Sequence, residues 1–592
     1  MKKLLLILSL LFAVQSYAQK DQLALSYYKK GQFEKALLAY QKLFEKNPGS
    51  YKYVVQLVKI NQQLGDFDEA EKLLLKRMTL SKSPVLFVEL GYNYQLKENL
   101  DKAKANYQLA IDKIDERPNF TYSIGKAFED HSLLPEAIQA YNKGMSLNAE
   151  LNYHIQLARI YGEQGNISAL YNSYLNYLST KPEYLNNVKR IFSGFVSEDA
   201  TNENNVLLKK TLLKKIQTTP DLQWNELLSW LYVQEEDYKK SFTQEKAIYK
   251  RNPESLDRIF ELGLTASDKK QYDIAISIFE YIIENSLNID SILAANEYIL
   301  DIKVAQAEPS DYESIHKNYK NLIKTYGITP STLLIQVAKS NFVAFYLNKP
   351  EDAIKELKNC LKLNLNKFQE SRVKLKLGDV LVYQEKFNEA LIYYSQIQMN
   401  LKNSTISQEA RFKVAKTSYY KGDFDWAESQ LKILKSSTSQ LIANDALDLK
   451  LLISDNKYED SLQTSLKLYS KADLLAFQNN SSEAIKLLDI IRTEHKGESI
   501  EDQALFKQAQ LFEAQGDFDS AIENYNYIIA NYREDILADD AYFALANLYA
   551  KVFNMAEKAK PLYEAILFEH QDSIYFIEAR KQFRKLRGDA IN

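Results

Sequence analysis

Phe33-Glu34-Lys35-Ala36 is the first of four closely spaced copies of one short motif. The other three are Phe67-Asp68-Glu69-Ala70, Leu100-Asp101-Lys102-Ala103 and Leu134-Pro135-Glu136-Ala137. The alanines that end successive copies lie 34, 33 and 34 residues apart. A fixed period of this length is typical of proteins built from stacked structural repeats. The period therefore indicates the architecture before any single motif is considered.

The motif returns through the rest of the 592-residue sequence. The clear later copies end at Ala275, Ala390, Ala427 and Ala521, and the weaker ones end at Ser241, Ala353, Ala484 and Ala559. Spacing in the C-terminal half is larger, because Ala353, Ala390 and Ala427 lie 37 residues apart, as do Ala484 and Ala521. We therefore expect two arrays of different period, with longer helices or connections in the second.

Each copy has the features of two short helices packed side by side. A Leu-Gly or Leu-Ala pair precedes the final Ala by about a dozen residues, so that a small side chain lets the second helix approach closely. A Gly often lies five residues before that Ala, where a left-handed residue can end the first helix. An aromatic residue often follows four residues after it, one helical turn further on the same face. Examples are Leu90-Gly91, Gly65 and Tyr107.

These positions resemble the tetratricopeptide repeat, a helix-turn-helix unit of 34 residues. The resemblance covers most of residues 19–592. It implies an all-α fold in which tandem helix pairs form an α-solenoid, a right-handed superhelix. It also implies a concave groove lined mainly by the first helix of each pair.

Two stretches depart from the pattern, and they divide the chain. Residues 186–220 carry no recognisable copy, and residues 286–333 contain helix-like segments broken by Pro309 and Pro330. We interpret both as divergent or interrupted repeats that act as hinges. The expected organisation is a signal peptide over 1–18, an N-terminal array over 19–185, a hinge over 186–220, a middle array over 221–333, and a C-terminal array with a capping helix over 334–592.

The N-terminus predicts export. Met1-Lys2-Lys3 is followed by an apolar run over 4–14 and by small residues at Ser16 and Ala18, the pattern of a cleavable signal peptide. An apolar run of eleven residues is well short of the ~20 that span a bilayer. No Cys lies near residue 18, so no lipid-attachment site is expected. We expect an exported, periplasmic protein of bacterial type without an integral membrane segment after cleavage.

The composition offers little for catalysis or nucleic-acid binding. The net charge is -3 with no long single-sign tail, so no nucleic-acid partner is expected. The five His residues are far apart, and no phosphate-binding glycine motif is present. The single Cys360 is interpreted as a small buried residue. The sequence therefore predicts no catalytic residue, no cofactor and no metal site, and a protein that is not an enzyme.

Binding of other proteins or peptides is the leading functional hypothesis. Residues on the first helices that lie off the packing stripe are expected to face the groove, and they are Tyr28, Lys29, Tyr92, Tyr122, Lys126 and Arg159. Aromatic and basic side chains of these types dominate protein-recognition hot spots. The longer C-terminal repeats resemble Tol-Pal coordinators and outer-membrane-assembly repeat proteins. That resemblance implies a scaffold in envelope assembly or secretion, associated with outer-membrane complexes. A glycan-binding protein of nutrient uptake and an oligomeric spacer remain alternatives.

Overall fold

The computed structural model describes residues 21–434, 439–458 and 462–589 of the protein. Every regular element in these ranges is a helix, as expected for an α-solenoid. The predicted signal peptide lies outside the described residues. Among the helices that are described, none combines the length and the apolar character needed to cross a membrane. The protein divides into two compact units, one ending at Glu235 and the other beginning at Glu236.

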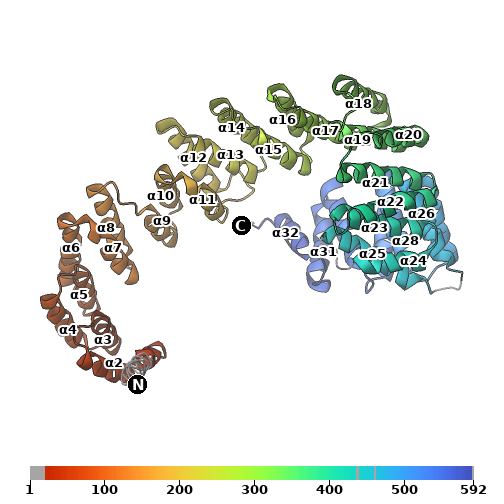
Figure 1. Ribbon diagram of the computed structural model, residues 1–592. Helices are drawn as coiled ribbons and strands as arrows, with labels where there is room; N and C mark the ends of the chain where they lie inside the picture. Colours follow the sequence, from red (N-terminus) through yellow and green to blue (C-terminus); the bar gives the residue numbers. More distant parts are fainter. Residues whose placement is uncertain (1–20, 435–438, 459–461, 590–592) are drawn as a thin grey trace, which may run out of the picture. The chain divides into compact units, whose positions relative to one another are not determined.

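Unit 1 contains residues 21–29, which are helical, and a series of helix pairs. Figure 1 shows α3, α5 and α7 along the inner side of an arc whose outer side is formed by α4, α6 and α8. We call the first helix of each pair the A helix and the second the B helix. The elements are α2 (Phe33–Lys46), α3 (Tyr51–Leu64), α4 (Phe67–Leu80), α5 (Val85–Leu96), α6 (Leu100–Glu116), η1 (Pro118–Phe120), α7 (Thr121–Asp130), α8 (Leu134–Leu147), α9 (His154–Glu163), α10 (Ile167–Thr180), η2 (Pro182–Tyr184), α11 (Leu185–Phe192), α12 (Glu203–Thr218) and α13 (Leu222–Gln234).

Unit 2 continues the same pattern with several longer A helices. For example, α21 and α23 have 17 and 16 residues, against 12 and 10 in α5 and α7. The elements are α14 (Tyr238–Arg251), α15 (Asp257–Asp268), α16 (Tyr272–Asn285), α17 (Ile289–Ala305), η3 (Pro309–Asp311), α18 (Tyr312–Tyr326), α19 (Leu333–Phe345), α20 (Pro350–Cys360), α21 (Lys367–Tyr383), α22 (Phe387–Asn400), α23 (Thr405–Tyr420), α24 (Phe424–Leu434), α25 (Gln440–Asn456), α26 (Thr464–Phe477), α27 (Ser481–Glu494), α28 (Glu501–Gln515), α29 (Phe518–Asn531), α30 (Ala538–Asn547), η4 (Leu548–Val552), α31 (Ala556–Glu569) and α32 (Phe576–Arg587).

The recurring residues form the core between the two helices of each pair. In α7 and α8, Ala137 and Tyr141 are fully buried. The Tyr141 ring covers Gly125, where a Cβ atom would lie only 2.6 Å from the ring carbon Cε1. Such a distance is well inside the ~3.5–4.0 Å of a normal carbon–carbon contact. The small residue of the motif is thus required for the close approach of the two helices, as the sequence predicts.

A left-handed residue ends the A helix in every recognised copy, whether or not it is Gly. Gly31 and Gly65 have φ of 70° and 79°, as expected from the sequence. The same place is taken in other copies by larger residues with φ between 51° and 60°, namely Glu98, Ser132, Glu236, Lys270, Asn348, Glu385, Asn479 and Asn554. Each lies five residues before the final Ala or Ser of its copy. The fixed helix-pair geometry therefore sets this backbone conformation, although non-Gly residues adopt it at some cost.

The two divergent stretches also fold into helices. In 186–220, α12 buries Leu208 and Leu212, so the basic segment there is a repeat helix. In 286–333, Ile315 and Tyr319 of α18 are buried four residues apart, in the positions that Ala and the aromatic residue hold elsewhere. Whether either stretch acts as a hinge stays a prediction.

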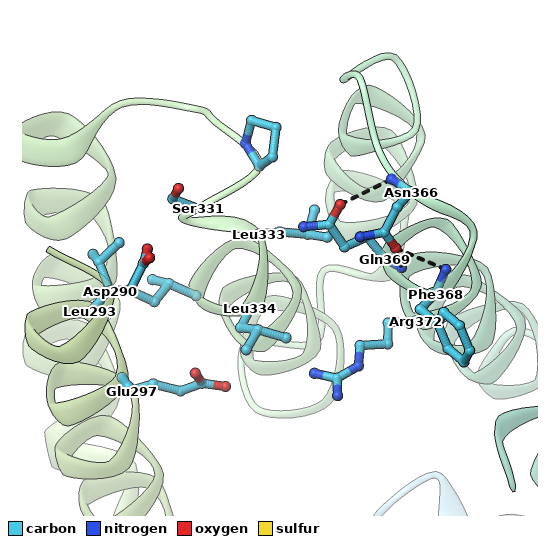
Figure 2. Close-up of a pocket in the computed structure, with 13 residues that line it drawn as sticks. Asp290, Leu293, Glu297, Ser331, Leu333, Leu334, Asn366, Phe368, Gln369 and Arg372 are labelled. Carbon is cyan, nitrogen blue, oxygen red and sulfur yellow. Dashed lines mark hydrogen bonds between the residues drawn. The ribbon is translucent and has the colours of Figure 1, made fainter. Parts of the chain in front are cut away.

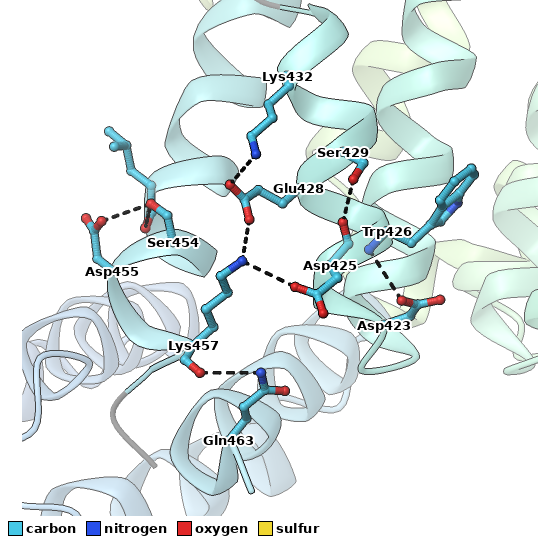
Figure 3. A network of polar contacts seen from close by, with 11 residues as sticks. Asp423, Asp425, Trp426, Glu428, Ser429, Lys432, Ser454, Asp455, Lys457 and Gln463 are labelled. Carbon is cyan, nitrogen blue, oxygen red and sulfur yellow. Dashed lines mark hydrogen bonds and ion pairs between the residues drawn. The ribbon is translucent and has the colours of Figure 1, made fainter. Parts of the chain in front are cut away.

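The helix α25 is an insertion that breaks the regular alternation in unit 2. It explains why Ala427 and Ala484 are 57 residues apart. Figure 3 shows Lys457, next to the end of α25, reaching back to α24, where its Nζ lies 2.5 Å from Glu428 Oε2 and 3.3 Å from Asp425 Oδ1. The Gln463 side-chain amide donates to the Lys457 carbonyl at 3.3 Å. This network joins α24 to α25 and α25 to the start of α26.

The end of α26 returns to helices that are far away in the sequence. Gln478 Nε2 donates to the Tyr383 carbonyl at 2.9 Å across 95 residues, and Asn479 Nδ2 donates to the Phe345 carbonyl at 3.1 Å across 134 residues. The rings of Phe345 and Phe477 meet edge to face at 5.5 Å. The ends of α19, α21 and α26 are thus in direct contact.

The C-terminal helix and the single cysteine both contribute to the packed core. Phe583 of α32 is buried in a cluster with Tyr563 and Ile566, and the role of α32 as a capping helix stays a prediction. Cys360 is buried, and its thiol donates to Gln336 Oε1 at 3.4 Å. Burial raises the pKa of this thiol to about 11, which keeps it protonated and unreactive.

Candidate functional site

Four of the six predicted groove residues lie on successive A helices of unit 1. Tyr92 is on α5, Tyr122 and Lys126 are on α7, and Arg159 is on α9. Tyr92 is half-buried and stacks on the ring of His131, with centroids 3.9 Å apart. The Nε2 atom of His131 lies 3.1 Å from Glu89 Oε2, so the stacked pair is anchored to α5. The Tyr92 ring therefore has a fixed position on this surface.

Glu129 on α7 organises the basic side chains of the cluster. Its carboxylate accepts a hydrogen bond of 2.6 Å from the Tyr141 hydroxyl and contacts the Arg159 guanidinium. Lys126 Nζ lies 3.7 Å from Glu129 and 2.7 Å from Asp130, and the hydrogen bond to Asp130 raises the pKa of Lys126. Because Glu129 is buried while the Arg159 side chain is 53% exposed, the guanidinium is oriented yet accessible to a partner.

Tyr122 is the exposed aromatic residue of this group. Its side chain is 51% exposed, and its ring stacks on Tyr153 with centroids 6.4 Å apart. We call Tyr92, Tyr122, Lys126 and Arg159 the unit 1 surface. An exposed tyrosine held by a neighbouring ring loses little rotamer freedom when it is covered, which favours its use in binding.

The other two predicted residues do not join this cluster. Tyr28 and Lys29 belong to the first helical segment, at 21–29. The Tyr28 ring packs edge-on against Phe33 at 5.6 Å, and Lys29 is exposed. Their place on a binding surface stays a prediction.

Unit 2 contains a groove that sequence reasoning missed. Figure 2 shows its main cavity, about 490 Å³, between α17, α19 and α21. A second cavity of about 390 Å³ continues it toward α23 and shares Glu297, Leu334 and Arg372 with the first. We call the main cavity the unit 2 groove. Its lining residues are Asp290, Leu293, Ala294, Glu297, Pro330, Ser331, Leu333, Leu334, Ile335, Asn366, Phe368, Gln369 and Arg372.

Opposite charges line the two sides of the unit 2 groove. Glu297 extends from α17 and Arg372 from α21, and Figure 2 shows both side chains reaching into the space beside Leu334. The pKa of Glu297 is raised to about 7, mainly by burial and also by the nearby Asp301, while Arg372 opposes the shift. Glu297 is therefore only partly ionised at neutral pH.

The continuation of the groove is occupied by internal ion pairs. Lys413 Nζ lies 2.9 Å from Asp379, and the Tyr394 hydroxyl donates to the same carboxylate at 2.8 Å. Burial alone would raise the pKa of Asp379, but Lys413 and Lys376 hold it below its usual value. These charges are paired directly, whereas Glu297 and Arg372 form no ion pair within the residues that the structure describes.

The unit 2 groove had no clear sequence signal. Its acidic side lies in 286–333, where the repeat motif is not recognisable. The Ile315 and Tyr319 pair, four residues apart in the place of Ala and aromatic, could have located this repeat. Only then could Glu297 have been placed on an A helix opposite Arg372.

Comparisons with known proteins agree with the helix-pair geometry. Two models described as tetratricopeptide repeat match the sequence, one at residues 21–50 and the other at 469–536 and 506–574. No curated protein matches the sequence. Among solved structures, one protein of "Structure of Naa15/Naa10 bound to HypK-THB" is 14% identical, with 97% of each of the two proteins covered and a TM-score of 0.28.

One protein of "Crystal structure of APC/C hetero-tetramer Cut9-Hcn1" is 12% identical, with 95% of each of the two proteins covered and a TM-score of 0.25. With TM-scores this low, neither structure adds to the description of the fold. The repeat matches and the paired helices agree in both units. Tetratricopeptide-repeat models thus match part of each unit, and the helix pairs continue between the matched segments.

Proposed function

We propose that this protein is an exported scaffold that binds other proteins in the periplasm, in cell-envelope assembly or secretion. The unit 1 surface carries the proposal, because it places two tyrosines and an oriented arginine on neighbouring A helices. Tetratricopeptide repeats indicate a protein-interaction scaffold, and aromatic and Arg side chains supply most of the binding energy in such interfaces. The N-terminal pattern of residues 1–18 supports export.

Partner capture with surface variants tests the binding role. Full-length tagged protein is crosslinked in cells, purified and analysed by mass spectrometry, with Tyr122→Ala and Arg159→Ala as test variants. Lys104→Ala and Leu109→Ala serve as matched controls, because both residues are exposed on the B helix α6. Hot-spot truncations weaken binding by about 2 kcal/mol or more, roughly thirtyfold.

The expected result is a protein recovered with the wild type and with both α6 variants, but depleted with Tyr122→Ala and Arg159→Ala. Equal recovery with all four variants would contradict a binding role for the unit 1 surface. Recovery of no protein, or only of further copies of the same protein, would contradict the scaffold function and favour the oligomeric spacer.

Cell fractionation and N-terminal sequencing test the export part of the proposal. The expected product is found in the periplasm and begins at Gln19, after cleavage behind Ala18. Full-length protein that retains Met1 and stays in the cytoplasm would contradict it.

A further inference from the structure

The unit 2 groove has the layout of a site for a ligand with two opposite charges. Carboxylates of Asp290 and Glu297 stand on the α17 side, and the Arg372 guanidinium stands on the α21 side. Leu334, on α19, lies between these sides and is 38% exposed (Figure 2). The volume, about 490 Å³, is within the ~300–1,000 Å³ typical of ligand pockets. It is large enough for several side chains of a peptide.

The opposite charges of this groove face each other without direct contact in the part of the protein that the structure describes. Neither Glu297 nor Arg372 forms a hydrogen bond or ion pair there, although each lies near charged neighbours. The ion pair between Asp379 and Lys413 shows that the same A-helix face neutralises its charges elsewhere. Burying a carboxylate that has no direct ion-pair partner costs free energy that an incoming cation can recover. A guanidinium at an open rim is suited to bidentate binding of a carboxylate.

The rim of the groove is held in place by local hydrogen bonds. Asn366 Oδ1 accepts from the backbone N–H groups of Phe368 and Gln369 at 3.0 and 2.9 Å, and Gln369 Oε1 accepts from the Asn366 N–H at 3.0 Å. This capping box fixes the start of α21. It leaves the Phe368 side chain 57% exposed at the edge of the cavity. The exposed ring adds apolar surface on the α21 side of the cavity, near Arg372 (Figure 2).

We propose that the unit 2 groove binds an extended segment of a partner protein in which a Lys or Arg and a carboxylate flank an apolar residue. The basic side chain faces Asp290 and Glu297, the apolar side chain lies on Leu334, and the carboxylate pairs with Arg372 on the side of Phe368. The carboxylate comes from an Asp or Glu side chain or from the partner's own C-terminus. The inference rests on the proposed function, that this protein binds other proteins, and adds a second surface with its own chemistry.

Fluorescence anisotropy with defined peptides tests this assignment on the full-length protein. The probes are fluorescein-labelled, C-amidated octapeptides in which one Lys and one Glu flank one to four Leu residues. Companion peptides replace Lys or Glu by Gln, and a further set replaces Glu by a free C-terminal carboxylate. Removing either charge from the best-binding peptide is expected to weaken binding at least tenfold, the usual scale for a charge-assisted hydrogen bond.

Protein variants identify which side of the groove binds each charged group of the peptide. Glu297→Gln is expected to weaken the preference for Lys over Gln, because only Asp290 then remains on that side. Arg372→Gln is expected to abolish the preference for Glu over Gln. Glu313→Gln on α18 and Lys355→Gln on α20 are matched controls, since both are exposed charged residues on B helices of the same unit. Circular dichroism verifies that all four variants keep the wild-type helix content.

The assignment is overturned if no peptide binds, if the neutral peptides bind as tightly as the charged ones, or if Glu297→Gln and Arg372→Gln leave the charge preferences unchanged. The comparison of amidated and free C-termini decides the source of the carboxylate. The partner captured in cells separates this inference from the proposed function. One result would overturn the inference and leave the proposed function standing. In that result, capture of the partner depends on Tyr122 and Arg159, but peptide binding is unchanged by Glu297→Gln and Arg372→Gln.

Discussion

The contact between Gly125 and Tyr141 gives the sharpest stability prediction. Gly125→Ala adds a Cβ atom that would lie 2.6 Å from both Cε1 and Cζ of the Tyr141 ring. The ring is fully buried, and its hydroxyl is tied to Glu129 Oε1 at 2.6 Å. The ring therefore cannot move aside without losing that hydrogen bond, and α7 and α8 must separate instead.

A second glycine in the same unit provides the matched control. Gly162 lies in α9, where a Cβ atom would meet only Leu170 Cδ1, the end of a flexible side chain, at 3.2 Å. Ala is favoured over Gly inside a helix by about 1 kcal/mol, and this gain applies to both substitutions. Gly162→Ala should therefore leave stability unchanged or raise it slightly.

The difference between the two variants isolates the cost of the clash. Overpacking a well-packed core costs about 1–3 kcal/mol. Gly125→Ala should thus be less stable than Gly162→Ala by about 1–3 kcal/mol. Urea denaturation of both variants followed by far-UV circular dichroism measures this difference. Equal stabilities would refute the reasoning that a small residue is needed for close approach of the two helices.

Three further predictions concern charge and exposure. The pKa of Glu297 is raised to about 7 in the folded state. The free energy of unfolding therefore falls as the pH rises above about 4.5, the ordinary pKa of Glu. Glu297→Gln should raise the urea midpoint at pH 8 and not at pH 4. Lys457→Met should destabilise unit 2 by about 1–3 kcal/mol at pH 7. The Lys457 hydrogen bond holds the pKa of Glu428 below its usual value in the folded protein. The stability difference between wild type and Lys457→Met should therefore be complete above about pH 4.5, and should disappear as the pH falls through the folded-state pKa of Glu428. Limited proteolysis should first cut unit 1 at 193–202, which joins α11 to α12 and is mostly exposed.

Each of these has a clear contrary outcome. If Glu297→Gln changes the urea midpoint equally at pH 4 and pH 8, the pKa of this carboxyl is not raised in the folded protein. If Lys457→Met is as stable as the wild type, the ion pairs of Lys457 contribute nothing to the free energy of unfolding. Early cleavage scattered along unit 1 would contradict the predicted hinge over 186–220.

The fold followed from the sequence because its determining contacts are local. Gly125, Ala137 and Tyr141 fall within one repeat, and their spacing in the sequence predicts how the two helices of that repeat pack. A copy was overlooked where Leu170 replaces the final Ala, although Gly165, with φ of 70°, lies five residues before it. The insertion of α25 was also missed, because an amphipathic helix without the motif carries no signature.

The proposed binding surfaces were harder to predict than the fold. Tyr92, Tyr122 and Arg159 could be placed on A helices because their repeats are regular. The position of Arg159 also depends on Glu129, whose hydrogen bond to Tyr141 and contact with Arg159 join α7, α8 and α9. The unit 2 groove combines side chains more than seventy residues apart, and only the packing of α19 against both α17 and α21 brings them to one cavity.

Site-specific photo-crosslinking in cells tests the central claim, that the A-helix surface binds protein partners, most directly. A benzoyl-phenylalanine residue is introduced in place of Tyr122 on α7 or, as control, Leu109 on α6, which is 47% exposed. We predict a protein adduct from position 122 that is lost with Arg159→Ala, and none from position 109. Adducts from position 109 alone, or equal adducts from both positions, would contradict the account.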